Sequence, residues 1–97
     1  MAVQVRWSTR AASDLERICD HMGLDSEIYA TLFAKHVVAL VEGLEEFPRS
    51  GRIVPEYGIE TLREKVFQNY RIVYRIRREA VEVVAIVHGA RQLPDAL

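Results

Sequence analysis

The sequence of 97 residues lacks the features that mark secreted, membrane-spanning or disordered proteins. It has a single cysteine, so no disulfide can form within the chain, and the expected location is the cytoplasm. No unbroken apolar run exceeds five residues, whereas a membrane span needs about 20. The first residues alternate like a strand and do not resemble a secretion signal. Hydrophobic residues form 49% of the chain, which is enough for one folded domain over residues 1–97.

The chain has no large excess of positive or negative charge, because its formal net charge is −1. The charges are segregated along the chain: residues 1–47 carry −4, residues 48–78 carry +5 and residues 79–97 carry −2. This segregation predicts a basic face and a separate acidic face, each able to bind a partner of opposite charge. The acidic face is expected on the helices, at Asp14, Glu16, Asp20, Glu42, Glu45 and Glu46.

The N-terminal half predicts a short strand followed by two helices. Residues 3–7 alternate between apolar and polar side chains, which is the period of a half-buried strand. Ser8 or Thr9 can cap a first helix, which Gly23 would end, and its apolar stripe is Ala11, Leu15, Ile18 and Met22. Asp25 or Ser26 can cap a second helix, which ends before Pro48 and whose stripe is Phe33, Val37, Leu40, Val41, Leu44 and Phe47. The short link predicts an antiparallel helical hairpin.

The C-terminal half predicts three strands after a loop at residues 48–60, which is rich in proline and glycine. The strands are expected at 62–67, 70–76 and 81–88, with a tight turn at Gln68-Asn69, where Asn tolerates the left-handed conformation. The last strand is apolar on both faces apart from Glu82, which is typical of a central, covered strand. The order β-α-α-β-β-β predicts an α+β fold: a small antiparallel sheet with an N-terminal two-helix hairpin packed on one face.

The strand at 70–76 carries the densest group of cations. Because side chains alternate, Arg71, Arg75 and Arg77 are expected on the open face of the sheet, and Tyr70 and Tyr74 on the face toward the helices. Such arginines could bind phosphate or carboxylate groups. The alternative is an ordinary charged face, paired across strands with Glu64 or Glu82. A module that binds RNA directly would carry aromatic side chains on the open face instead.

His88 closes the last strand, where it could act as a general base near neutral pH or could simply cap the strand. His21 and His36 lie on different helices, with no cysteine or acidic residue at ligand spacing, so neither a metal site nor a cofactor is predicted. Cys19 lies beside the apolar stripe of the first helix and is expected to be a small buried hydrophobe.

Six short segments, none specific alone, follow one another along nearly the whole chain. They are Val3–Trp7, Ala11-(x)2-Asp14-Leu15-(x)2-Ile18, Leu44-(x)2-Phe47-Pro48-(x)2-Gly51-Arg52, Leu62-Arg63-Glu64, Tyr70–Ile76 and Val87–Arg91. In this order and spacing they resemble the RelE/ParE superfamily of toxins from bacterial type II toxin–antitoxin modules, and its ParE-like branch most of all. The resemblance implies the same α+β fold and a cognate antitoxin, ParD-like or of another type, that neutralises the toxin in a hetero-oligomeric complex.

The resemblance leaves two activities, because ParE-like toxins inhibit DNA gyrase and RelE-like toxins cut messenger RNA on the ribosome. RNA cleavage needs a base, an acid and cations on the phosphate. Here Arg63, Arg71 and Arg75 could supply the cations and His88 one proton carrier, but the tail after the last strand lacks the tyrosine that RNA-cutting relatives commonly place there. The sequence therefore favours a gyrase inhibitor without catalytic residues; a ribosome-dependent endoribonuclease remains the alternative. The residues expected to bind the target are Arg63, Arg71, Arg75, His88 and Arg91.

Overall fold

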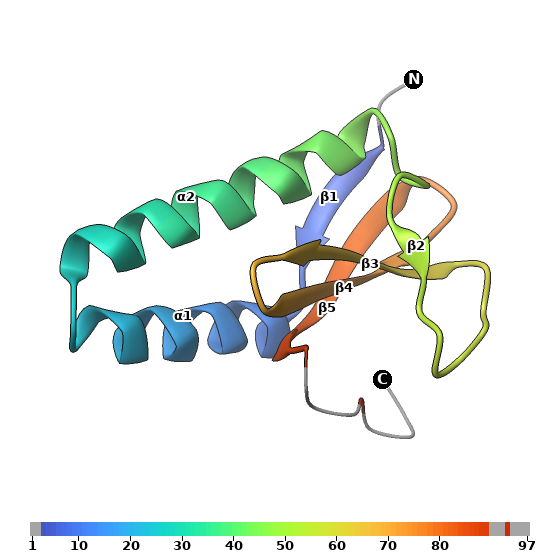
Figure 1. The fold of residues 1–97 in the computed structure, drawn as a ribbon. Helices are drawn as coiled ribbons and strands as arrows, with labels where there is room; N and C mark the ends of the chain where they lie inside the picture. The colour runs from blue at the N-terminus through green and yellow to red at the C-terminus, as the bar shows by residue number, and fades with distance from the viewer. Residues whose placement is uncertain (1–2, 90–92, 94–97) are drawn as a thin grey trace.

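Two antiparallel helices and a five-stranded sheet form the fold in a computed structural model, which describes residues 3–89 and 93 (Figure 1). In chain order the elements are β1 (Gln4–Trp7), α1 (Thr9–Gly23), α2 (Glu27–Glu42), the short 3-10 helix η1 (Gly43–Glu45), β2 (Arg52–Ile53), β3 (Leu62–Phe67), β4 (Tyr70–Ile76) and β5 (Ala80–His88). The helical hairpin packs on one side of the sheet, so the predicted α+β class is confirmed. Neither α1 nor α2, the helices of this part of the chain, is long and apolar enough to cross a membrane.

Both helices begin at the predicted serine caps. The Ser8 hydroxyl accepts a hydrogen bond from the backbone N–H of Ala11 at 3.0 Å, and Ser26 caps α2 in the same way. Gly23 ends α1 as predicted, but as the last helical residue and not beyond the cap. Leu24 is the cap residue and keeps the right-handed conformation, because the N–H groups of the next residues bond back to the last turn of α1 and lead directly into α2.

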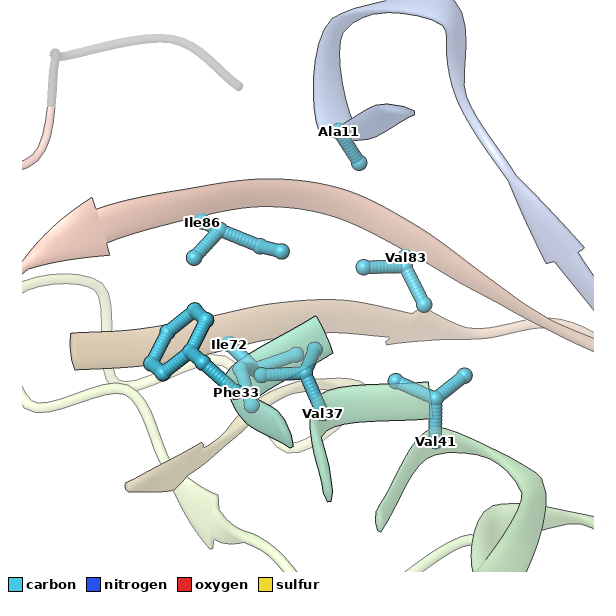
Figure 2. Close-up of a cluster of buried hydrophobic side chains, with 7 residues drawn as sticks. All are labelled: Ala11, Phe33, Val37, Val41, Ile72, Val83 and Ile86. Atoms are coloured by element: carbon cyan, nitrogen blue, oxygen red, sulfur yellow. The ribbon is translucent and has the colours of Figure 1, made fainter. Parts of the chain in front are cut away.

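The main core lies between the hairpin and the sheet (Figure 2). Its buried members are Ala11, Phe33, Val37, Val41, Ile72, Val83 and Ile86, so the apolar stripes predicted for both helices face the sheet. Phe47, the last member of the second stripe, is instead 66% exposed. The α-helix ends at Glu42 and η1 follows, and a 3-10 turn rotates each residue further round the axis than an α-helix does. The helical period of the stripe is therefore lost before Phe47.

The sheet has the strand order β1-β5-β4-β3-β2. Strands β3 and β4 have the predicted limits, and β5 lies between β1 and β4 as predicted for a central strand. The sheet is mixed and not purely antiparallel, because β1 returns beside β5 in parallel after the helical hairpin. The two-residue strand β2 pairs with β3 inside the segment predicted as loop. In the β3–β4 turn Gln68, not Asn69, has the positive φ, at 52°.

A bulge in β5 changes which side chains face the helices, so that Val83 and Ile86, three residues apart, lie on the same face. Val73 lies opposite Ala85 and Tyr74 lies opposite Val83, so Val84 has no partner of its own. Beyond the bulge Ala85 joins a second apolar cluster, on the face of the sheet turned away from the helices, which we call the outer face. That cluster consists of Val54, Leu62, Val73, Ala85 and Leu93. The outer face, predicted to be open, is thus partly covered by the segment after β2 and by Leu93.

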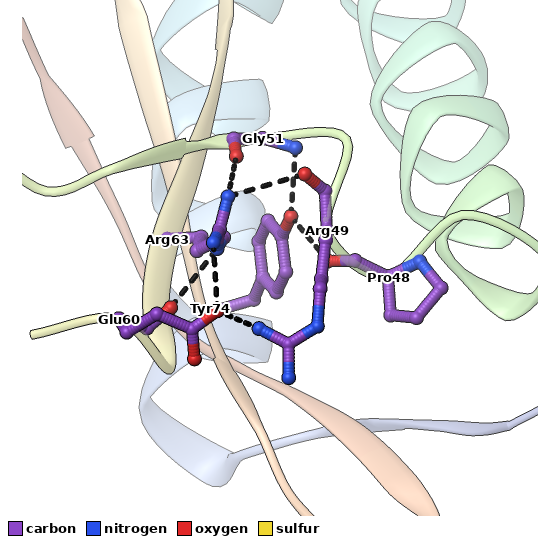
Figure 3. Close-up of polar contacts among 6 residues, drawn as sticks. All are labelled: Pro48, Arg49, Gly51, Glu60, Arg63 and Tyr74. Atoms are coloured by element: carbon purple, nitrogen blue, oxygen red, sulfur yellow. Dashed lines mark hydrogen bonds and ion pairs between the residues drawn. The ribbon is translucent and has the colours of Figure 1, made fainter.

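Tyr74 fixes the start of the segment that leads into β2 (Figure 3). Its hydroxyl donates to the carbonyl oxygen of Pro48 at 2.7 Å and accepts from the backbone N–H of Gly51 at 2.9 Å. A Cβ atom at Gly51 would lie 2.6 Å from the Tyr74 hydroxyl and 2.6 Å from the backbone oxygen of Glu64, so only glycine fits. Burial raises the pKa of Tyr74, which keeps the hydroxyl protonated as a donor.

We expect Tyr74→Phe to lower the free energy of unfolding by about 1–3 kcal/mol, because it leaves the buried N–H of Gly51 and the half-buried carbonyl of Pro48 without their partner. Tyr57→Phe is the matched control, since the Tyr57 hydroxyl is buried without a hydrogen-bond partner in the described part of the chain. Urea unfolding of both variants measures the difference. Equal losses in the two variants would contradict the role given to Tyr74.

Candidate target-binding surface

Arg71 is buried, and the prediction that it lies on an open face is wrong. Arg71 is only 7% exposed, and its guanidinium contacts two carboxylates at once. Its two terminal nitrogens donate to Glu56 at 2.6 and 2.7 Å, and its Nε donates to Glu64 at 2.7 Å. The alternative interpretation of the sequence, a pairing with Glu64, is the correct one. The hydrogen bonds from Arg71 lower the pKa of Glu56 to about 2, from an ordinary value of 4.5.

Glu64 is the most deeply buried charged side chain of this network. Its carboxylate has no exposed surface and also accepts from Nε of Arg52 at 2.6 Å. The network therefore alternates in sign, from Arg52 through Glu64 and Arg71 to Glu56, and carries no net charge. Glu56 belongs to the segment after β2 and also accepts from the backbone N–H of Leu93, so the network ties that segment and Leu93 to β3 and β4.

Arg63 serves the backbone of the same segment from the opposite side of β3 (Figure 3). Its guanidinium donates to the carbonyl oxygens of Arg49, Gly51 and Glu60 at 2.9–3.2 Å and to the Glu60 carboxylate at 3.0 Å. The side chain is only 14% exposed. Arg63 thus holds the segment in place, and little of its side chain is accessible to a partner protein.

Arg75, Arg77 and His88 keep contact with solvent. Arg75 is half-buried and lies opposite Glu82 in the β4–β5 pairing, and Arg77 is exposed and lies 3.4 Å from the Glu82 carboxylate. His88 is exposed at the end of β5 and stands edge-on to Tyr70, with 5.5 Å between ring centres. Arg91 lies outside the described residues. Of the five residues predicted to bind a target, the structure leaves Arg75 and His88 accessible.

A shallow pocket of about 370 Å³ lies on the outer face beside the ion network. Its lining residues are Arg52, Pro55, Glu56, Val66, Gln68, Asn69, Arg71, His88 and Gly89. Two of the residues predicted to bind a target, Arg71 and His88, line this pocket, and Glu56 lines it as well. A negatively charged ligand would therefore meet a carboxylate where the sequence predicted only cations.

Neither metal chemistry nor a reactive thiol is indicated by the described residues. Within residues 3–89 and 93 no three histidine, cysteine or acidic side chains lie close enough to share a metal ion. The thiol of Cys19 packs beside the main core, 3.8 Å from the carbonyl oxygen of Ala30, and burial raises its pKa. A raised pKa keeps the thiol neutral and unreactive.

Sequence reasoning missed Glu56 and Arg52 as members of the network. Glu64 alternates in phase with Leu62, which marks it as facing the same interior, and this signal was available. Glu56 gave no comparable signal, because it lies in a segment without a period.

Comparison with known proteins places the chain among bacterial toxins. Residues 5–93 match the family model described as the ParE toxin of the type II toxin–antitoxin system parDE. Toxin RelE2 of Caulobacter vibrioides is 36% identical over 89 residues, which cover 91% of this chain and 97% of that protein. A solved structure of the chromosomal ParDE toxin–antitoxin system from P. aeruginosa superposes with a TM-score of 0.75 at 20% identity. The match covers 90% of this chain and 96% of that one.

We expect Glu64→Gln to destabilise the protein by roughly 3–5 kcal/mol, because it leaves the buried cation of Arg71 with one carboxylate fewer. Glu60→Gln is the matched control, since its carboxylate is 55% exposed and its ion pairs lie at the surface. Thermal and urea unfolding measure both variants. A loss for Glu64→Gln no larger than that of the control would show that the network does not stabilise the fold.

The lowered pKa of Glu56 predicts a loss of stability in acid. A carboxyl with a folded pKa of about 2 and an ordinary value of 4.5 stabilises the fold above pH 4.5, and this stabilisation disappears as the pH falls toward 2. Glu56→Gln should therefore lower the melting temperature at pH 7 by about 5 °C, as a change of ~1 kcal/mol does in a domain of this size. The difference from wild type should shrink between pH 5 and pH 2 in a series of melting curves. A difference that does not vary with pH would contradict the pairing of Glu56 with Arg71.

Proposed function

Because the chain belongs to the ParE toxin family of type II toxin–antitoxin systems, we propose that it inhibits DNA gyrase and thereby blocks replication, and that a cognate ParD-like antitoxin neutralises it. The proposal makes the chain a binding protein and not a nuclease. Growth inhibition then depends on contacts with gyrase and on no chemical step carried out by the toxin.

The observation that supports the proposal is that two carboxylates already occupy the guanidinium of Arg71. A ribonuclease needs cations that can stabilise the charge of the scissile phosphate. The guanidinium of Arg71 is instead engaged by Glu56 and Glu64, both within 2.7 Å. A phosphate could reach Arg71 only by displacing a carboxylate whose lowered pKa reflects how strongly it is held.

The proton carriers support the same conclusion. Cleavage by attack of a 2′-hydroxyl needs both an acid and a base. Tyr74 is excluded from these roles because its hydroxyl is bonded to the backbone of Pro48 and Gly51 in the interior. Tyr70 packs against Phe33 on the helix side, with ring centres 5.2 Å apart. Among the described residues that line the outer pocket, His88 is the one histidine, the side chain that most often serves as an acid or base.

The contact with gyrase is assigned to the accessible cations on and beside the outer face. Arg49 and Arg52 have side chains that are 56% and 60% exposed, and Arg75 and His88 lie on the neighbouring strands. Arg75, His88 and Arg91 belong to the set predicted from the sequence, and Arg91 lies outside the described residues; Arg49 and Arg52 are added here. Arg63 contributes by holding the backbone of Arg49 and Gly51, next to Arg52.

The proposal is tested by adding purified toxin to a gyrase supercoiling reaction and, in parallel, to a translating extract. We expect inhibition of supercoiling that the antitoxin relieves, and intact messenger RNA in the extract. His88→Ala should leave messenger RNA equally intact. If the toxin were a ribonuclease that used His88 as acid or base, this variant would cleave messenger RNA about 10²–10⁴-fold more slowly than the wild type.

Ribosome-dependent cleavage of a message that His88→Ala abolishes would overturn the proposal in favour of a ribonuclease. Supercoiling that continues at a toxin concentration sufficient to arrest growth would overturn the gyrase target.

A further inference from the structure

A second hollow, of about 580 Å³, lies between α1 and the ends of β4 and β5. It is formed by one face of α1, on which Arg10, Asp14, Arg17, Ile18 and His21 recur at helical spacing, and by Tyr70, Ile86, Val87 and His88 from the strands. Two cations and two imidazoles therefore surround a floor of apolar side chains. No residue of this hollow other than His88 lines the pocket on the outer face.

The hollow exists because β1 is shorter than β5. The parallel pairing ends at Trp7 and Val83, after which the chain turns away into α1 (Figure 1). The Ser8 hydroxyl and the Asp14 carboxylate then satisfy single backbone groups of β5: Ser8 donates to the carbonyl oxygen of Val84, and Asp14 accepts from the N–H of Ile86 at 3.0 Å. The end of β5 is thus bordered by helix side chains and not by a strand.

Asp14 was predicted to belong to an exposed acidic face, but it is only 4% exposed. Besides the N–H of Ile86, its carboxylate meets the guanidinium groups of two arginines: Arg17 donates a hydrogen bond to it, and Nε of Arg10 lies 3.8 Å away. Within residues 3–89 and 93 neither arginine has another carboxylate partner. Two guanidinium groups therefore share one carboxylate and leave a net charge of +1 at the hollow.

We propose that this hollow binds an aspartate or glutamate side chain, together with a neighbouring apolar residue, from an extended segment of the cognate antitoxin. One carboxylate would neutralise the excess charge of Arg10 and Arg17, whose side chains are 49% and 70% exposed and can bond it through paired N–H donors. The apolar floor of Ile18 and Ile86 suits an aliphatic side chain beside it. This inference rests on the proposed function, because it supposes that a protein antitoxin exists.

A peptide carboxylate fits better than a nucleic-acid phosphate for two reasons. One peptide carboxylate balances the net charge of +1, whereas successive phosphates would add more negative charge than the two arginines and Asp14 leave to be balanced. The apolar floor offers nothing to a phosphate chain, whereas a peptide alternates polar and apolar side chains along an extended segment.

The test measures the affinity of purified antitoxin for the toxin variant Arg10→Ala/Arg17→Ala by calorimetry. We expect a loss of about 10–100-fold, since hydrogen bonds to charged groups contribute about 1.5–3 kcal/mol and 1.4 kcal/mol is tenfold. Arg6→Ala/Arg78→Ala removes the same charge from two exposed residues that do not line the hollow, and should change the affinity less than threefold, about a third of one such bond. A charge swap identifies the antitoxin residue. The acidic residues of the antitoxin are replaced by arginine one at a time, and one of these replacements should restore binding to the toxin variant Arg10→Glu/Arg17→Glu.

Each result separates the inference from the function on which it rests. Equal affinity of the hollow variant and the control, with wild-type toxin still neutralised, overturns the inference alone. Failure of wild-type toxin to bind antitoxin overturns the proposed function as well. A variant that loses binding to a DNA or RNA fragment but not to antitoxin overturns the peptide ligand. If the alanine pair does not fold, Arg10→Lys/Arg17→Lys keeps both charges without the planar forks and should lose about three- to tenfold.

Discussion

The carboxylate of Glu64 has no exposed surface, and the structure around it is arranged to neutralise it. Removing a carboxylate from water is costly unless cations and hydrogen bonds replace the solvent. Arg52 and Arg71 supply both, and Arg71 in turn needs Glu56 to occupy its remaining donors. Because Glu56 belongs to the segment after β2, the buried charge on β3 determines where that segment lies. The apolar cluster beneath the segment then covers part of the outer face of the sheet.

This constraint changes what the basic half of the chain can do. The arginines of residues 48–78 divide into those that hold the fold, chiefly Arg63 and Arg71, and those that remain exposed to partners. Two hollows of the described residues share only His88: the pocket on the outer face beside the ion network, and the hollow beside α1 where Arg10 and Arg17 surround Asp14. A toxin that binds both a target and an antitoxin can use separate surfaces for the two.

Local patterns were sufficient to predict much of the fold, because caps, stripes and turn residues act over a few positions. Ser8, Ser26, both helical stripes and the strands at 62–67 and 70–76 follow from such patterns. The misses depend on distant contacts. The bulge at Val84 is imposed by pairing with β4, and the burial of Arg71 depends on Glu56, 15 residues away in a segment without periodicity. Of the candidate site, His88 kept its predicted exposure, whereas Arg71 did not.

The central claim is that Arg71 acts within the fold and does not contact the target. The most direct test replaces the buried pair by apolar residues of similar size, Glu64→Met with Arg71→Met, since such replacements of buried ion pairs are often neutral or stabilising. The measurement is growth arrest by this double variant in cells that lack the antitoxin, once its folding has been established by circular dichroism. The account predicts arrest as strong as that caused by the wild type. A stable, folded double variant that no longer arrests growth would show that Arg71 acts on the target, and would contradict the account.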